Sequence, residues 1–130
     1  MIVLDASVVV EMLTGGDLAE SVRQELIGSD EPFIVPHLLD VEVASALRNL
    51  VAGRRLDSYH CERILAALAE LPAERYAHTP FLSRIWELRH NFSAYDAVYI
   101  ALAEATDSVL YTADEKLCKG HRATVVLFKR

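Results

Sequence analysis

Short apolar runs alternate with amphipathic stretches along the whole chain. Runs rich in Ile, Val and Leu are typical of strands, and stretches in which apolar residues recur every three or four positions are typical of helices. The runs predict strands at residues 2–5, 33–35, 76–78, 108–112 and 124–128, of which the third is short and polar. The amphipathic stretches predict helices at residues 7–13, 18–27, 38–51, 58–71, 80–90 and 94–105.

Residues that favour helix starts stand at several of these boundaries. Asp57 precedes one predicted helix, where its carboxylate can accept hydrogen bonds from the first backbone N–H groups. Asp17 is followed three residues later by Glu20, and Ser93 is followed three residues later by Asp96. Both pairs predict capping boxes, which mark where these two helices begin.

Strands that alternate with helices indicate an α/β fold. Right-handed helical crossovers between parallel strands place helices on both faces of a sheet, so we expect a three-layer α/β/α sandwich around about five parallel strands. Hydrophobic residues make up 52% of the 130 residues and charged residues 25%, which suits an ordinary globular core. No linker or repeat interrupts the pattern, so we expect a single domain over residues 1–130.

The balance of charge is acidic, because 19 Asp and Glu against 13 Lys and Arg give a formal net charge of −6. Such a chain lacks the broad basic surface of most nucleic-acid binders, so any RNA contact must be local or shared with another subunit. The two cysteines are far apart and lack metal-site spacing, which favours a reduced, cytoplasmic protein. No apolar run approaches the roughly 20 residues of a membrane span, so no membrane contact is expected.

Four acids occupy places where an α/β chain brings strand ends and helix starts together: Asp5, Glu42, Asp96 and Asp114. Two of them follow the first and fourth predicted strands, and ligands bind beyond the carboxyl ends of parallel strands where the strand order reverses. Like charges 5 Å apart repel by roughly 3 kcal/mol per pair at an effective dielectric near 20, so a fold that gathers four needs a cation. A carboxylate cage that holds a hard divalent metal beside water is suited to cutting phosphodiesters.

A strand end, a helix cap or a solvated helix face accounts for any one of these acids alone. Glu115 is a rival for Asp114, because a loop can aim either side chain into a site. Asp40 lies two residues before Glu42 on the same predicted helix, about 200° around its axis, so the two cannot share one site. We assign Glu42 to the site, and the spacing leaves the choice between Asp114 and Glu115 open.

A few further residues are candidates for supporting roles. The hydroxyls of Ser7 and Thr112 each stand two residues from one of the acids and can orient it. Arg89 is a candidate for contact with a phosphate. The five histidines show no metal-ligand spacing, and the aromatic face around Trp86 is expected in the core or in a dimer contact rather than in base stacking.

Four motifs follow one another in a fixed order: Ile2-Val3-Leu4-Asp5-Ala6-Ser7, Pro36-His37-Leu38-Leu39-Asp40-Val41-Glu42, Ser93-Ala94-Tyr95-Asp96-Ala97-Val98-Tyr99 and Thr112-Ala113-Asp114. Each motif alone is modest, but four in this order at this length are specific. They extend over essentially the whole chain. In this order they resemble a PIN domain and, more narrowly, the VapC toxins of bacterial type II toxin–antitoxin pairs.

The resemblance implies a PIN-like fold and a Mg²⁺-dependent ribonuclease, with Mn²⁺ as a substitute. Such toxins cut structured RNA, often tRNA or ribosomal RNA, and inhibit translation. The resemblance also implies a homodimer and a VapB-type antitoxin that blocks the site, in a heterotetramer or a larger assembly. The catalytic, metal-binding acids of the family carry over onto Asp5, Glu42, Asp96 and Asp114, and its supporting hydroxyls onto Ser7 and Thr112.

Other functional classes fit the length and the α/β alternation. A receiver-like signalling module also binds Mg²⁺, but this chain lacks an acidic pair after its first strand and a phosphoacceptor Asp after a middle strand. A phosphatase with an Asp-x-Asp pair needs a second acid where Ser7 stands. A PIN-type interaction module without catalysis remains an alternative, although the complete set of acids argues against it.

Overall fold

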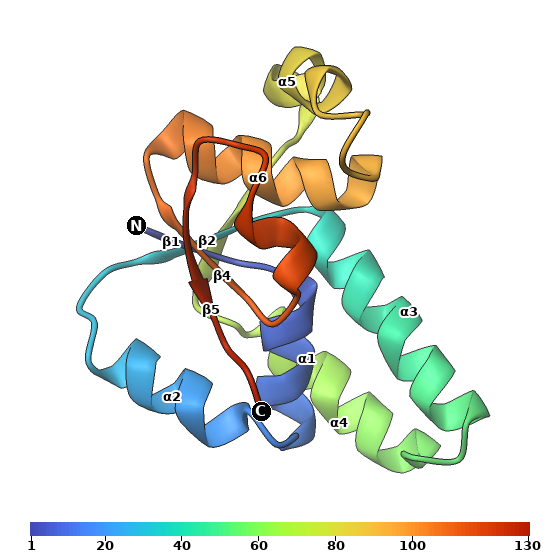
Figure 1. The fold of residues 1–130 in the computed structure, drawn as a ribbon. Coiled ribbons are helices and arrows are strands. Elements are labelled where there is room, and N and C mark those ends of the chain that lie inside the picture. Colours follow the sequence, from blue (N-terminus) through green and yellow to red (C-terminus); the bar gives the residue numbers. More distant parts are fainter.

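The computed structural model describes residues 1–130, and its centre is a sheet of five parallel strands (Figure 1). The strands are β1 (Ile2–Leu4), β2 (Phe33–Pro36), β3 (Ala73–Tyr76), β4 (Val109–Thr112) and β5 (Thr124–Leu127). Their order across the sheet is β3-β2-β1-β4-β5, and every neighbouring pair is parallel. The expected parallel sheet of about five strands is therefore confirmed.

Helices cover both faces of this sheet. They are α1 (Ala6–Thr14), α2 (Ala19–Ile27), α3 (Leu38–Ala52), α4 (Ser58–Ala69), α5 (Leu82–Glu87) and α6 (Ala94–Thr106), with 3₁₀ turns η1 (Thr79–Phe81) and η2 (Glu115–Cys118). Figure 1 shows α1 to α4 on one side of the sheet and α5 with α6 on the other, which is the expected three-layer arrangement. Every helix is too short or too polar to serve as a membrane span.

The core forms where both helical layers meet the sheet. All of β1 is buried, and so is a continuous stretch of α6 from Ala97 to Ala103. Alanines at 97, 101 and 103 have small side chains, which let the helix lie close to the strands it covers. The first turn of α6, which carries Asp96, is thereby held near the sheet.

β1 and β4 lie side by side at the centre, although they come from opposite ends of the chain. The strand order reverses between them, because β2 and β3 lie on one side of β1 while β4 and β5 lie on the other. Leu4 pairs with Tyr111 in the register, and the backbone N–H of Asp5 donates to the Tyr111 carbonyl at 3.1 Å. The residues that follow both strands therefore emerge at one edge, as expected for neighbours at such a reversal.

The third strand lies three residues earlier than predicted, at Ala73–Tyr76 instead of residues 76–78. It is an edge strand that pairs only with β2, so it tolerates polar residues along its length. Its Arg75 donates two hydrogen bonds to Asp40 of α3, at 2.8 and 2.9 Å. An apolar pattern could not locate this strand, because an ion pair and the sheet hydrogen bonds hold it in place.

The capping box predicted for Asp17 and Glu20 is wrong. Helix α2 begins at Ala19 without a side-chain cap. Glu11 of α1 accepts the backbone N–H of Leu18 at 3.2 Å instead, and Asp17 accepts a hydrogen bond from the Arg130 side chain at 3.1 Å. Contacts with distant segments have replaced the local cap.

The other helix starts follow their predicted caps. Asp57 accepts the backbone N–H of His60 at 2.8 Å, and Ser93 accepts that of Asp96 at 3.2 Å. The helix predicted over residues 80–90 is interrupted, because η1 precedes α5 and α5 ends at Glu87. Turns over residues 88–92 then redirect the chain, so that α6 can begin directly after Ser93.

Glu104, near the end of α6, ties three segments together. Its carboxylate accepts two hydrogen bonds from Arg84 of α5, at 2.7 and 3.0 Å, and one from the backbone N–H of Arg122, at 2.8 Å. The Arg122 guanidinium adds an ion pair at 3.5 Å, and only 7% of the Glu104 side chain is exposed. Burial raises the pKa of this carboxyl, but the hydrogen bonds and charges of the two arginines outweigh burial and lower the pKa to about 2.

Glu104→Gln should destabilise the protein by about 1–3 kcal/mol, because it leaves two arginines without their anion. The folded pKa lies below the ordinary value of 4.5, so the stabilisation is present above that pH and is lost as the pH falls toward 2. Urea denaturation should show a gap between wild type and variant that is full near pH 7 and shrinks below about pH 4. A gap that does not change with pH would contradict this role. Glu62→Gln is the control without a stability change, because Glu62 is exposed on α4 and forms no ion pair.

Candidate active site

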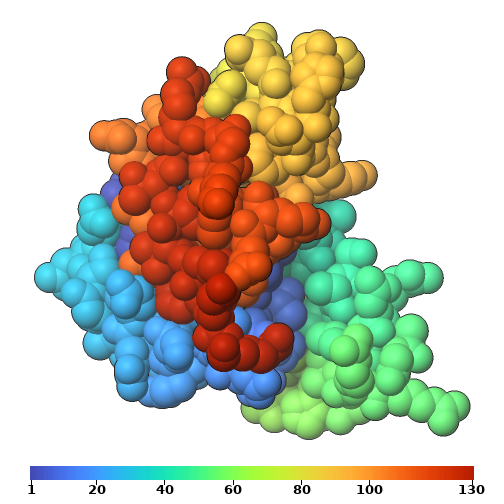
Figure 2. Space-filling view, viewed as in Figure 1, coloured from blue at the N-terminus to red at the C-terminus, as the bar shows by residue number.

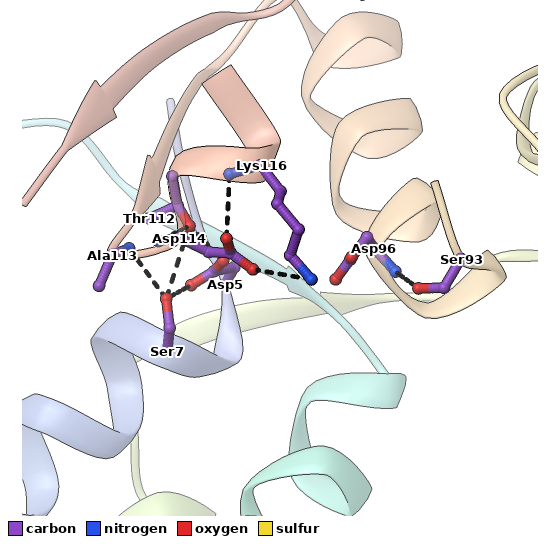
Figure 3. Close-up of polar contacts among 8 residues, drawn as sticks. All are labelled: Asp5, Ser7, Ser93, Asp96, Thr112, Ala113, Asp114 and Lys116. Carbon is purple, nitrogen blue, oxygen red and sulfur yellow. Dashed lines mark hydrogen bonds and ion pairs between the residues drawn. The ribbon is translucent and has the colours of Figure 1, made fainter. Parts of the chain in front are cut away.

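Asp5 begins the site at the end of β1, where it also caps α1. Its side chain is buried and accepts hydrogen bonds from the hydroxyls of Ser7 at 2.5 Å and Thr112 at 2.6 Å (Figure 3). The backbone N–H of Val8 adds a third, at 3.3 Å. Burial raises the pKa of Asp5, and these hydrogen bonds, which favour the ionised form, only partly oppose the rise. The carboxylate is therefore tightly oriented and poorly hydrated.

The same two hydroxyls hold the loop after β4. Ser7 Oγ accepts the backbone N–H of Ala113 at 2.9 Å, and Thr112 Oγ1 accepts that of Asp114 at 3.0 Å. Each hydroxyl thus donates to Asp5 and accepts from the loop, which joins the ends of β1 and β4. These are the contacts that an orienting role for Ser7 and Thr112 requires.

Glu42 lies in the first turns of α3 with a half-buried side chain. Its Oε1 atom is buried and makes no hydrogen bond, and neither does the buried hydroxyl of Tyr99 on α6. The two groups are close enough to shift each other's pKa, but their geometry stops short of a hydrogen bond. Burial is the main cause that raises the pKa of Glu42; Tyr99 opposes it, and the negative charges of Asp96 and Asp5 add to it. A buried oxygen without a partner is costly, and a cation would satisfy it.

Asp96 lies in the first turn of α6, just after the Ser93 cap (Figure 3). Burial raises its pKa above the ordinary value. The positive charge of Lys116 is the strongest influence against this rise, and the negative charge of Asp114 adds to it. Asp96 is therefore an electrostatic neighbour of the loop that follows β4.

The structure separates Asp114 from its rival Glu115. Asp114 caps η2 by accepting the backbone N–H of Lys116 at 3.0 Å, and its charge acts on Asp96. Glu115 is two-thirds exposed and forms an ion pair with Lys129 on the outer surface. Figure 2 shows this C-terminal segment, in red, at the surface between α5 in yellow and the blue helices α1 and α2. The geometry therefore favours Asp114 as the fourth acid.

Electrostatic influence links all four acids into one group. Glu42 senses the charges of Asp5 and Asp96, and Asp96 senses that of Asp114. The group is not a finished metal cage, because no three Asp, Glu, His or Cys side chains are gathered closely enough to coordinate one ion. The Lys116 ammonium stands beside them instead, 3.8 Å from Oδ2 of Asp114 (Figure 3).

Sequence reasoning missed two side chains of this group, Tyr99 and Lys116. Tyr99 lies three residues after Asp96, one turn further along α6, so helical spacing could have placed it beside the acids. Lys116 lies two residues after Asp114, and only the η2 turn brings its side chain back toward Asp96. No periodic pattern marks that turn.

Other residues singled out in the sequence lie apart from the acids. Arg89 stacks over the ring of Trp86 at 4.4 Å, and both side chains are exposed, which excludes the core, one of the two places expected for Trp86. Trp86 is 67% exposed, and a dimer contact, the other place expected for it, stays a prediction. Both cysteines are free and partly buried.

The site is marked by charge and not by a large cavity. Four hollows of about 350 to 680 Å³ lie on the surface of the protein, and none of the four acids lines any of them. The hollow beside Glu104 reaches the residues before β4 and β5, at the amino ends of the strands. The acids stand at the opposite ends of the strands, where an open edge suits a large substrate better than a closed pocket does.

The donor set fits a hard divalent cation. Carboxylate oxygens are the ligands that Mg²⁺ and Mn²⁺ prefer in proteins. The unpartnered Oε1 of Glu42 and the raised pKa values of Asp5, Glu42 and Asp96 indicate that the protein itself compensates these acids only in part. A bound cation would supply the rest.

Comparison with known proteins assigns the family. The model of the PIN domain matches residues 2–122. VapC ribonuclease Mb0985 of Mycobacterium bovis and ribonuclease VapC9 of Mycobacterium tuberculosis are each 44% identical over 117 residues, which cover 90% of this chain and 88% of each relative. Ribonuclease VapC12 of Mycobacterium tuberculosis is 33% identical over 129 residues, or 98% of both chains.

Solved structures share the fold at low sequence identity. Mycobacterium tuberculosis VapC20 aligns with a TM-score of 0.71 at 15% identity, over 90% of this chain and 92% of that one. A toxin–antitoxin complex from Klebsiella pneumoniae aligns with a TM-score of 0.72 at 18% identity, over 97% and 96%. The chain belongs to the PIN domain family and, within it, to the VapC ribonucleases.

Proposed function

We propose that this chain is a metal-dependent endoribonuclease, a phosphodiester hydrolase that serves as the toxin of a type II toxin–antitoxin pair. One observation carries the proposal: four acids from four separate segments act on one another at a single edge of the sheet. Its place among the VapC ribonucleases supports the same activity. A purely structural role gives no reason to keep like charges beside a buried oxygen that has no partner.

Mg²⁺ is the proposed cofactor, and Mn²⁺ its substitute. Asp5 and Asp96 would hold the ion directly, while Glu42 and Asp114 would complete its ligands or hold its waters. When bound there, the ion supplies Lewis acidity toward a phosphate and lowers the pKa of water. The carboxyl groups of the chain must be ionised to hold it, so uptake of the metal should release protons from the acids whose pKa is raised.

The chain's own hydroxyls prepare the site for this task. Ser7 and Thr112 direct their protons at the two oxygens of Asp5, which fixes the plane of that carboxylate before any ligand arrives. The same hydroxyls accept from the loop that carries Asp114, so the positions of two acids depend on one small network. Pre-organisation of this kind reduces the ordering cost of each metal or substrate contact.

Structured RNA, such as tRNA or ribosomal RNA, is the proposed substrate, cut to leave a 5′-phosphate and a 3′-hydroxyl. The similar VapC20 is described as a Sarcin-Ricin loop cleaving toxin, which supports this class. Because the net charge is −6, phosphate contacts need a local basic surface. The hairpin of α3 and α4 offers one, with exposed arginines that form no ion pair at positions 48, 54, 55 and 63, and Arg89 is a further candidate on α5.

A VapB-type antitoxin is the proposed partner, and the similar Klebsiella pneumoniae structure is a toxin–antitoxin complex. A homodimer that joins the antitoxin in a heterotetramer or larger assembly is part of the same proposal. The cytoplasm, where translation takes place, is the proposed location. The acidic edge would attract a basic segment of the antitoxin.

Asp5→Asn and Asp96→Asn should each lower RNA cleavage at least about a hundredfold, because each removes an ionised metal ligand. Denaturing gels with tRNA and ribosomal RNA, in MgCl₂ and in EDTA, measure the loss, and circular dichroism checks the fold. Glu115→Gln removes the neighbouring acid that faces outward and should retain the wild-type rate. Cleavage by the wild type in EDTA, or wild-type rates in either Asn variant, would refute the metal site.

Glu42→Gln should stabilise the metal-free protein near pH 7 by about 1 kcal/mol, or roughly 3–4 °C in Tm, while cleavage is lost. It removes a charge that burial disfavours and gives the Tyr99 hydroxyl a possible donor. Because the folded pKa of Glu42 lies above the ordinary value of 4.5, the cost of its charge grows as the pH rises above 4.5 and is full above the folded pKa. The advantage of Gln should therefore disappear as the pH falls toward 4.5.

Scanning calorimetry of both proteins in EDTA, from about pH 7 down to about pH 4.5, measures this crossover. A wild type more stable than the Gln variant at neutral pH would show that the Glu42 charge is already compensated by the protein.

A further inference from the structure

Lys116 is the cation that stands within the acid group in this structure. Its side chain extends from η2, is 77% exposed, and places Nζ 3.8 Å from Oδ2 of Asp114. Figure 3 shows the ammonium reaching from Asp114 toward the carboxylate of Asp96. Its charge is the main charge that opposes the raised pKa of Asp96.

No other basic side chain balances these acids. Burial and hydrogen bonds shift the pKa of Asp5, and the charges of Asp96 and Asp5 add to burial at Glu42; no Lys or Arg is among these causes. Arg75 pairs with Asp40 and Arg84 pairs with Glu104, so these two arginines serve other anions. Lys116 is therefore the basic side chain that offsets part of the negative charge of Asp96 and Asp114.

We propose that Lys116 is a tethered counter-cation of the metal-free site and competes with the divalent ion for the carboxylates of Asp96 and Asp114. This inference rests on the metal site of the proposed function. It makes Lys116 a positioning residue, which acts through the acids and not on the reacting bond. The contact at 3.8 Å is an ion pair without hydrogen-bond geometry, so it can be given up when a stronger cation arrives.

The chemistry of lysine suits such a role. An ammonium on a flexible four-carbon stem is a compact point charge that can approach and leave without moving the backbone. The stem of Lys116 starts from a turn that Asp114 itself caps, so the counter-cation and one of its acids move together. In the metal-free protein the lysine lowers repulsion between the acids, and it raises the concentration of metal needed to fill the site.

Lys116→Met tests this inference, because Met keeps an unbranched stem and removes the charge. Isothermal calorimetry with MnCl₂, without RNA, should show Mn²⁺ binding about three- to tenfold tighter in the variant than in the wild type. Lys119→Met is the matched control, because Lys119 is an exposed lysine three residues away with no ion pair. Its affinity for Mn²⁺ should match the wild type.

Two further readouts separate direct competition from a general effect of net charge. The gain in Lys116→Met should persist in about 0.5 M KCl, where the Debye length falls to roughly 4 Å and distant charges are screened. In EDTA the same variant should melt about 1–3 °C below the wild type, and Mn²⁺ should remove that difference.

An unchanged or weaker affinity for Mn²⁺ in Lys116→Met would overturn the inference while leaving the metal site intact. Equal gains in Lys116→Met and Lys119→Met, or a gain that vanishes in high salt, would also overturn it, since a general field would explain both. Failure of the wild type itself to bind Mn²⁺ would instead reject the metal site of the proposed function, and the inference with it.

Discussion

Repulsion between carboxylates that are partly removed from water is the constraint on which this site depends. Asp5, Glu42 and Asp96 all have pKa values raised mainly by burial, and the charges of their neighbours add to the cost at Glu42 and Asp96. Elsewhere in the molecule, acids that are buried are paired with arginine, as Glu104 is with Arg84. The protein thus pairs Glu104 with arginine but leaves the acids at this edge with only the exposed Lys116. This shortage of positive charge supports the proposed cation site.

The topology of the fold gathers the acids and so creates this shortage of positive charge. Strands from the two ends of the chain pair at the centre of the sheet, so Asp5 and the loop with Asp114 emerge side by side. Helix α6 packs closely on the sheet through small residues and carries Asp96 in its first turn, while α3, which follows β2, carries Glu42 in its second turn. The α-helical starts also bring the positive ends of two helix dipoles toward the acids, which moderates the repulsion.

Much of this arrangement could be predicted from the sequence, because it follows from strong patterns. The apolar runs located four strands, and the position of Asp5 and Asp114 after two of them placed both at one edge, as the pairing of β1 with β4 confirms. The polar third strand was predicted three residues too late, because Arg75 is held by an ion pair and not by an apolar face. The failed cap at Asp17 has a similar cause, since a residue at the other end of the chain occupies its carboxylate.

Contacts that depend on side-chain geometry could not be predicted from the sequence. The choice between Asp114 and Glu115 needed the η2 turn, which directs one acid inward and the other toward Lys129. Lys116 enters the site through the same turn.

The most direct test of one shared cation site is paramagnetic broadening of backbone amide signals during a Mn²⁺ titration of the wild type. The account predicts that signals from all four acid-bearing segments broaden together at substoichiometric Mn²⁺. Broadening confined to one segment, or centred on another surface such as Glu115 and Lys129, would contradict it.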